Sequence, residues 1–184
     1  MTTRVGRPPL TPTMARAALA AMADDELLHA VGSLMLLAGL RRGEASGLLV
    51  GDWHPGPDPK LTVRSRMQER TIRVAPTVAA ELDALLVGED AEPHETRLLG
   101  LKPDGIPFML PRLFGAAMKR AGLDVTDHDL RRAAEAVVIE DGAPMAHVNA
   151  YFGLSAMFDD KALVSVPEGY DRGIVHVLEA AFAG

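Results

Sequence analysis

Apolar residues return every three or four positions through most of the chain, which is the spacing of helices that bury one face. In the longest run, residues 26–40, Leu27, Val31 and Leu34 fall on one side of a helix that the acidic pair 24–25 can begin. The same spacing predicts helices over residues 14–22, 26–40, 44–49, 78–86, 108–121, 128–139, 143–152 and 174–182.

Two short segments, Leu61–Val63 and Thr71–Val74, are instead typical of strands on either side of a polar turn. Residues 52–60 before them are dense in Pro and Gly, which predicts a turn. The pattern as a whole predicts one mainly helical domain with a small antiparallel β-sheet. We expect this domain to occupy residues 11–184, after an extended N-terminal arm over residues 1–10 in which prolines discourage a helix.

Composition narrows the function classes. The chain has 184 residues, enough for one well-buried core, and no cysteine, which excludes disulfides and thiolate metal sites. Its net charge of −6 argues against a general nucleic-acid binder, which would be basic. The charge is uneven, however: Lys60–Arg73 holds five basic residues and one acid, whereas Ala133–Gly184 holds eight acids and two bases. The protein can therefore present one positive face despite its acidic total.

No part of the sequence predicts a membrane protein. The apolar run Leu34–Leu40 is too short to cross a bilayer, and residues 1–9 contain no apolar stretch that could act as a secretory signal. We therefore expect a soluble, cytoplasmic protein. The histidines show no metal-ligand spacing, so no metal site is predicted.

Two motifs about ninety residues apart carry candidate chemistry. The run Leu36–Glu44, Leu-Leu-Ala-Gly-Leu-Arg-Arg-Gly-Glu, ends an apolar helix and turns directly into arginine. The run His128–Arg132, His-Asp-Leu-Arg-Arg, lies at the start of another predicted helix, where residues three apart share a face. Two arginines and a histidine brought together by folding suit a phosphodiester, because a guanidinium fork binds phosphate oxygens two at a time.

These motifs, with three further segments in the same order, resemble the catalytic domain of the tyrosine recombinases, the phage-integrase family. The resemblance covers roughly Leu10–Phe182. The segments that carry it are Leu36–Glu44, Leu48–Trp53, Lys119–Leu123, His128–Arg132 and, after Gly142, Tyr151–Ser155. It implies a tyrosine-recombinase (integrase) catalytic-domain fold.

The resemblance also implies a mechanism and a set of site residues. Arg41, His128 and Arg131 would surround a scissile DNA phosphate, and Glu44 would be a buried group that orients Arg41. In the family a tyrosine attacks phosphorus and stays bonded to the 3′ phosphate, while a hairpin lysine protonates the leaving 5′ oxygen. The arginines stabilise charge on the non-bridging oxygens, and no metal or other cofactor takes part.

Simpler roles for the same residues remain open. Arg41 can be a cation at a helix end, and Glu44 an acid in the first turn of a helix. His128 can be a capping residue, and Arg131 a surface cation.

The sequence departs from the family at three positions. The predicted hairpin contains no lysine, so Arg66 or Arg70 would have to replace it, although the high pKa of arginine makes it a poor acid. Leu154 stands where the family has a histidine that forms hydrogen bonds. The nucleophile is expected near residues 163–164, whereas the tyrosine of this region is Tyr170, which could serve only after a longer loop.

The function expected from this combination is DNA binding. The basic residues expected to contact DNA besides the phosphate site are Arg64, Arg66, Arg70, Arg73 and Arg132. Binding of double-stranded DNA should be weak, because family members usually carry a preceding helical core-binding domain that completes a clamp, and we expect none here.

We expect a recombinase-like protein of a mobile element or phage, built for site-specific recombination by ancestry but impaired in strand cleavage. It would act as a homo-oligomer or with a partner recombinase. A non-catalytic DNA-binding regulator and a protein-interaction module that retains the fold are the alternatives.

Overall fold

The computed structural model describes residues 8–65, 68–86, 98–99, 106–154 and 166–183. Most of the predicted arm, Arg66 and the positions 163–164 lie outside the described residues. The elements are α1 (Pro12–Ala20), α2 (Glu26–Leu37), α3 (Arg42–Gly47), the 3-10 turn η1 (Val50–Asp52), β1 (Trp53–His54), β2 (Lys60–Arg64), β3 (Glu69–Arg73), α4 (Pro76–Leu86), α5 (Ile106–Arg120), α6 (Asp127–Glu140), α7 (Met145–Phe152) and α8 (Arg172–Phe182).

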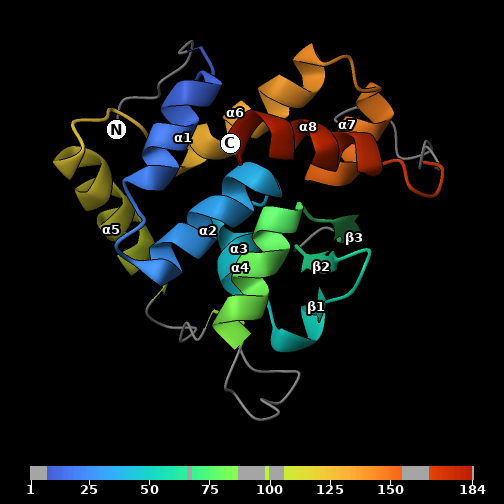
Figure 1. The fold of residues 1–184 in the computed structure, drawn as a ribbon, viewed down its shortest axis with the longest axis horizontal. Coiled ribbons are helices and arrows are strands. Elements are labelled where there is room, and N and C mark those ends of the chain that lie inside the picture. The colour runs from blue at the N-terminus through green and yellow to red at the C-terminus, as the bar shows by residue number, and fades with distance from the viewer. Residues whose placement is uncertain (1–7, 66–67, 87–97, 100–105, 155–165, 184) are drawn as a thin grey trace.

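Helix α2 is the centre of the fold, as its apolar sequence predicts. Nine of its twelve residues are buried, because α1, α4, α6 and α8 all pack against it. Figure 1 shows the helices gathered around α2, with the sheet at one edge of the molecule and α5 at the other. Among the described residues, no helix is long and apolar enough to cross a membrane.

The end of α2 differs from the prediction in a way that builds the site. The helix ends at Leu37 rather than at Leu40, because Gly39 adopts a left-handed conformation with φ of 64°. The backbone N–H of Leu40 then bonds back to the carbonyl of Leu34 at 3.0 Å, which closes the helix end. The chain turns sharply there, and Arg41 becomes the N-cap residue of α3.

The sheet has the predicted hairpin and one strand more. Strands β1, β2 and β3 are antiparallel in that order, with Leu61 opposite Ile72, and both of these side chains are fully buried. The extra strand, β1, consists of two residues in the region predicted to be a turn, and Trp53 of this strand pairs with Leu61. Its indole N–H donates to Asp83 of α4 at 2.9 Å, so β1 is held by tertiary contacts that a local pattern does not reveal.

Helix α7 joins the sheet to the helical core. Tyr151 is fully buried, and its hydroxyl donates to the carbonyl of Arg73 on β3 at 3.1 Å. The helix ends at Gly153, which is left-handed with φ of 61°. This turn lies beside the one at Gly39, since the ring of Phe152 reaches that glycine.

Candidate functional site

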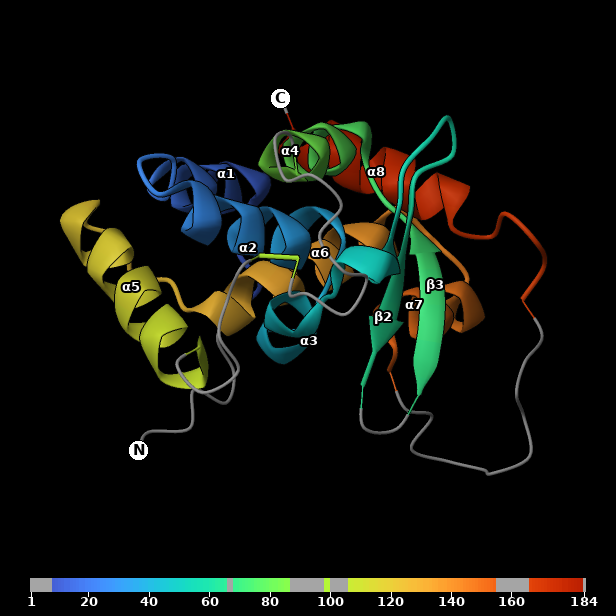
Figure 2. The same ribbon diagram turned by 90° about the horizontal axis from the view of Figure 1, so that it is seen from below.

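A pocket of about 300 Å³ opens where α2 ends, α3 begins and α6 begins. It is lined by Met35, Arg41, Arg42, Gly43, Asp127, His128 and Arg131. Figure 2, which views the molecule from below, shows α3 between α5 and the β-hairpin. Three of the predicted site residues, Arg41, His128 and Arg131, therefore line one cavity although the two motifs lie far apart in the chain.

Arg41 is much more exposed than Arg131, the other predicted arginine of the pocket. Its side chain is 45% exposed, and it donates to Glu44 at 3.1 Å and to the carbonyl of Gly153 at 3.0 Å. Glu44 also accepts the backbone N–H of Arg41 at 2.8 Å. The guanidinium is thus held from two sides while one part of it faces solvent, which suits the capture of an external anion.

Arg131 is buried and makes a different set of contacts. Its Nη1 donates to the carbonyl of Gly39 at 2.8 Å, and its Nη2 donates to the carbonyl of Phe152 at 2.6 Å. Its Nε donates to Glu135 at 2.7 Å. Burial lowers the pKa of Arg131, although an arginine stays charged at neutral pH. Arg131 therefore fastens the ends of α2 and α7 to α6, and its nitrogens already have partners within the protein.

Glu44 is the common partner of three arginines. It is buried, and besides Arg41 it accepts a bidentate pair of hydrogen bonds from Arg70, at 2.9 and 3.1 Å. Arg131 lies 3.6 Å from the same carboxylate. Burial raises the pKa of Glu44, but the hydrogen bonds from Arg70 and from the backbone of Arg41 outweigh it and hold the pKa below its ordinary value. Glu44 thus remains ionised and orients the arginines around it.

The sequence named Arg70, but it did not predict that Arg70 belongs to this network. It was predicted as a DNA contact or a lysine substitute, yet its side chain is only 8% exposed and turns inward, where its Nε donates to the carbonyl of Tyr151 at 2.9 Å. The guanidinium of Arg70 is therefore bonded inside the protein, and contact of Arg70 with DNA stays a prediction. Arg70 and Ile72 share the buried face of β3, so strand alternation was the available signal.

Arg73, which was also predicted as a DNA contact, is likewise buried and paired. It donates to both oxygens of Asp58, at 2.5 and 2.8 Å, and to Asp171 at 2.5 Å. Asp171 also accepts the backbone N–H of Arg73 at 2.8 Å. Because Asp171 directly precedes α8, these bonds tie β3 to the last helix.

Two of the other predicted DNA contacts lie nearer the surface. Arg64 is half exposed and pairs with Asp52 and, at 2.9 Å, with Glu69. Arg132 is about one-third exposed and lies 3.8 Å from Asp129. Arg66 cannot be placed, because it lies outside the described residues.

We call the pocket lined by Arg41, Arg42 and Arg131 the arginine pocket. Among the described residues, Tyr170 is not one of those that line it. Its ring packs edge-on against His147, with ring centres 5.6 Å apart. Burial, with the Asp171 carboxylate adding to it, raises the pKa of Tyr170 to about 12. Leu154, one of the positions at which the sequence was predicted to depart from the family, is half-buried and packs against the core.

No hairpin lysine is placed at the pocket. Lys60 is the first residue of β2 and lies opposite Arg73 of β3 in the strand register. This is the end of the hairpin away from the turn, because the turn joins Arg64 to Glu69. Its amine lies 3.3 Å from Asp58. Among the described residues, Arg41, His128 and Arg131 therefore line the pocket without a lysine beside them.

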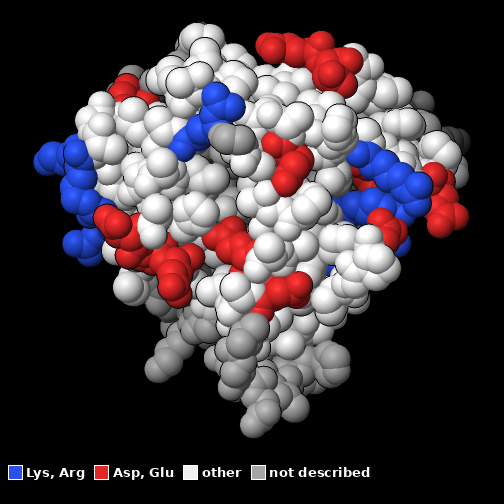
Figure 3. Space-filling model, viewed as in Figure 1, with Lys and Arg blue, Asp and Glu red and all other residues white. Residues whose placement is uncertain are grey.

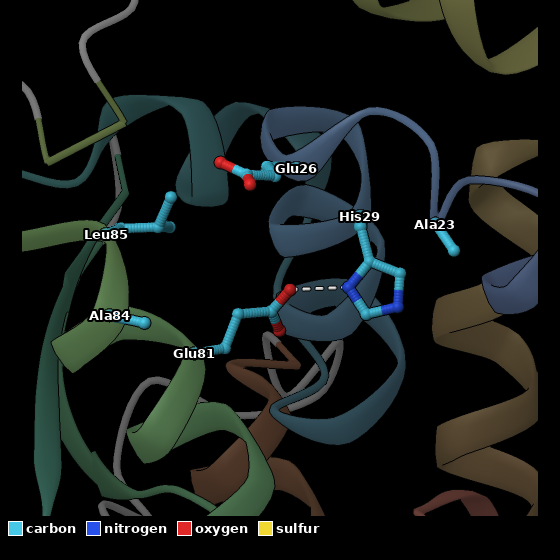
Figure 4. A pocket seen from close by; sticks show the side chains of 6 residues that line it. All are labelled: Ala23, Glu26, His29, Glu81, Ala84 and Leu85. Carbon is cyan, nitrogen blue, oxygen red and sulfur yellow. Dashed lines mark hydrogen bonds and ion pairs between the residues drawn. The ribbon is translucent and has the colours of Figure 1, made fainter.

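A second pocket, of about 410 Å³, lies between α2 and α4 (Figure 4). It is lined by Ala23, Glu26, His29, Glu81, Ala84 and Leu85. Figure 4 shows the His29 ring turned toward Glu81, and their Nδ1 and Oε1 atoms are 2.5 Å apart. The hydrogen bond to Glu81 raises the pKa of His29. Within the described residues, no group of three His, Asp or Glu side chains is placed to hold a metal ion.

Comparison with solved structures identifies the architecture. The integrase from mycobacterium phage Brujita matches 97% of this chain with a TM-score of 0.74 at 17% identity, and the match covers 60% of that protein. XerA recombinase matches 84% of this chain, with a TM-score of 0.66 at 22% identity over 57% of its own length. The lambda integrase catalytic core matches 80% of this chain and 95% of itself, with a TM-score of 0.59 at 18% identity. The chain has the catalytic-domain fold of the tyrosine recombinases.

The match is one of fold. No family model and no curated relative matches the sequence. The chain spans about half the length of the XerA and XerH recombinases that it matches, 57% and 48% respectively. The pocket lined by Arg41, Arg42 and Arg131 lies at the junction of α2, α3 and α6, so residues of both motifs that predicted the fold line one cavity.

Proposed function

We propose that this protein binds double-stranded DNA through the arginine pocket and descends from a site-specific recombinase of a phage or mobile element. The observation that carries the proposal is that Arg41, His128 and Arg131 line one cavity within a recombinase fold. A phosphodiester suits this cavity, because Arg41 presents part of its guanidinium to solvent while Glu44 holds it in place.

The affinity of this pocket for one phosphate is modest. Four arginines surround it or lie just beneath it, but three carboxylates, those of Glu44, Asp127 and Glu135, pair with them. Most of the positive charge is therefore neutralised inside the protein before DNA arrives. The face seen in Figure 3 adds no strong attraction, since acidic groups lie across its middle over α2 and α4, while basic groups lie over α1 and toward the two sides. We expect weak binding, with a salt dependence as shallow as a small number of phosphate contacts implies.

Strand cleavage by this chain is impaired. Tyr170 lies half-buried against His147, and its raised pKa means that the hydroxyl holds its proton more firmly than a free tyrosine does. Attack on phosphorus needs the opposite, a hydroxyl activated by a nearby base and aligned with the phosphate. Leu154 stands where the family has a histidine, and its side chain can pack but cannot form hydrogen bonds. Among the described residues, no lysine lies beside the pocket to protonate the leaving oxygen.

The test of DNA binding compares two arginine variants. Fluorescence anisotropy with a labelled duplex at low salt should show a loss of about threefold to tenfold in affinity for Arg41→Gln, the range expected for one phosphate contact. Arg112→Gln on α5 removes the same charge from an exposed position away from the pocket and should change affinity less than twofold. Equal losses in the two variants would remove the pocket from the binding surface.

The test of cleavage uses a nicked duplex that traps a covalent 3′-phosphotyrosyl adduct. We expect no adduct under conditions where the duplex is bound. An adduct that forms with the wild-type protein and disappears in Tyr170→Phe would show a working nucleophile and contradict the proposal of impaired cleavage.

A second function, a regulatory or protein-interaction role that retains the fold, is favoured by the acidic face over α2 and α4 and by the net charge of −6. DNA would repel such a face, whereas a basic protein surface would complement it. In the anisotropy titration this function predicts no binding of duplex DNA by the wild-type protein, even at low salt.

A further inference from the structure

The arginine pocket contains a carboxylate of its own. Asp127, the first residue of α6, lines the cavity beside Arg41 and His128. One of its oxygens accepts a hydrogen bond from Nη1 of Arg42, and the other accepts the backbone N–H of His128 at 3.0 Å. An internal anion therefore already takes up two donors at the wall of a pocket suited to a phosphodiester.

We propose that Asp127 is a competing anion that must release Arg42 before the pocket can hold a DNA phosphate at full strength. This inference rests on the proposed DNA-binding function and adds its regulation. Phosphate binding is an exchange, in which Arg42 leaves the carboxylate of Asp127 and donates to the incoming phosphate oxygens. Asp127 thereby lowers the affinity of the pocket for a DNA phosphate in two ways. Its carboxylate repels the phosphate, and it pairs with Arg42, which would otherwise bind the phosphate.

The exposure of the pair makes this exchange feasible. The side chains of Arg42 and Asp127 are 39% and 22% exposed, so water can replace each partner when the pair opens. The pair between Arg70 and Glu44 has side chains 8% and 4% exposed, so opening it would leave charges in a dry interior. Arg42 is thus the arginine that can change partners, whereas Arg70 stays with Glu44.

Glu135 does not play the same part. It bonds Nε of Arg131, but it does not line the pocket. The Nη atoms of Arg131 are bonded to backbone carbonyls, so removal of Glu135 would release no mobile cation into the cavity. Asp127 is therefore the acidic side chain whose removal changes the pocket itself.

The test removes the charge of Asp127 and measures duplex DNA affinity by anisotropy. Asp127→Asn keeps the size of the side chain and should bind DNA about fivefold more tightly at low salt, with the gain shrinking as salt screens the charges. The matched control, Asp141→Asn, removes the same charge at the exposed opposite end of α6 and should gain less than twofold. Thermal unfolding followed by circular dichroism confirms that both variants fold.

A second pair of variants separates exchange from simple repulsion. In an Arg42→Gln background, Asp127→Asn should gain less than twofold, because no arginine is left to be released. An undiminished gain in that background, or equal gains for Asp127→Asn and Asp141→Asn, would overturn the exchange.

The outcomes also separate this inference from the function on which it rests. DNA binding that depends on Arg41 but does not strengthen in Asp127→Asn would overturn the inference alone. An absence of binding by both the wild-type protein and Asp127→Asn would overturn the inference and the proposed function together.

Discussion

Replacing Glu44 with glutamine should destabilise the protein by about 3 kcal/mol, because it removes the shared anion of a buried cluster. The side chains of Glu44, Arg70 and Arg131 are 4%, 8% and 4% exposed, so both arginines would keep their charge in a dry site. Breaking a buried pair from one side costs about 3 to 5 kcal/mol. Glutamine retains one acceptor oxygen, which places the expected loss at the lower end of that range.

Urea unfolding followed by circular dichroism measures this loss directly. For a chain of this length, about 3 kcal/mol corresponds to a fall in Tm of about 6 to 12 °C. Glu69→Gln is the matched control, since that side chain is 62% exposed and pairs with the half-exposed Arg64, where the expected loss is below about 1 kcal/mol. If Glu44→Gln lost no more stability than Glu69→Gln, the carboxylate would not be what holds the arginines.

The remaining predictions concern positions away from this carboxylate. Gly39→Ala should cost about 2 to 4 kcal/mol of unfolding free energy in calorimetry, because a Cβ would lie 2.2 Å from the Phe152 ring and φ is +64°; a loss below about 1 kcal/mol would contradict this. His29 has a raised pKa, so its pairing with Glu81 stabilises the fold fully below its ordinary pKa of 6.5 and ceases to do so as pH rises through the higher folded value. The stability gap between the wild-type protein and His29→Gln should therefore narrow from pH 6 to pH 9, and a constant gap would refute the link. Tyr170 should ionise only near pH 12 in ultraviolet absorbance titrations, and Tyr170→Phe should leave DNA affinity unchanged; ionisation near 10 or a clear loss of affinity would contradict its packed position.

Most of the helices could be predicted from the sequence because their apolar residues recur with helical spacing, and the residues that end them are local signals. Thr11 accepts the N–H of Met14 at 3.3 Å, and Asp25 accepts that of Leu28 at 3.0 Å, as expected of N-cap residues. The end of α2 could not be predicted as well. Its apolar pattern continues through Leu40, and Gly39 breaks the helix before the pattern stops.

The candidate site could be predicted where it depends on motifs and not where it depends on packing. The runs around Arg41 and His128 identified side chains that line one pocket. We did not predict from the sequence that Arg131 would donate its Nη hydrogen bonds to backbone carbonyls, or that Arg70 would turn inward to Glu44. The contacts of Arg131 depend on how the left-handed turns at Gly39 and Gly153 meet in space, which no local spacing encodes, whereas for Arg70 strand alternation was the available signal.

The basic composition of the hairpin did not reveal how its charges are paired. Arg73 lies in a stretch rich in arginine, but its partner Asp58 comes from the turn between β1 and β2, and its partner Asp171 directly precedes α8. A count of basic residues cannot show which of them are neutralised by distant carboxylates.

The most direct test of the central claim is the salt dependence of DNA binding by Arg41→Gln. Affinity for a duplex should be measured over a salt series for the wild-type protein, Arg41→Gln and the control Arg112→Gln. If Arg41 neutralises one phosphate, the slope of log K against log salt should fall in magnitude by about 0.9 in Arg41→Gln and stay unchanged in Arg112→Gln. A slope in Arg41→Gln equal to that of the wild-type protein would contradict the claim that this pocket holds a DNA phosphate.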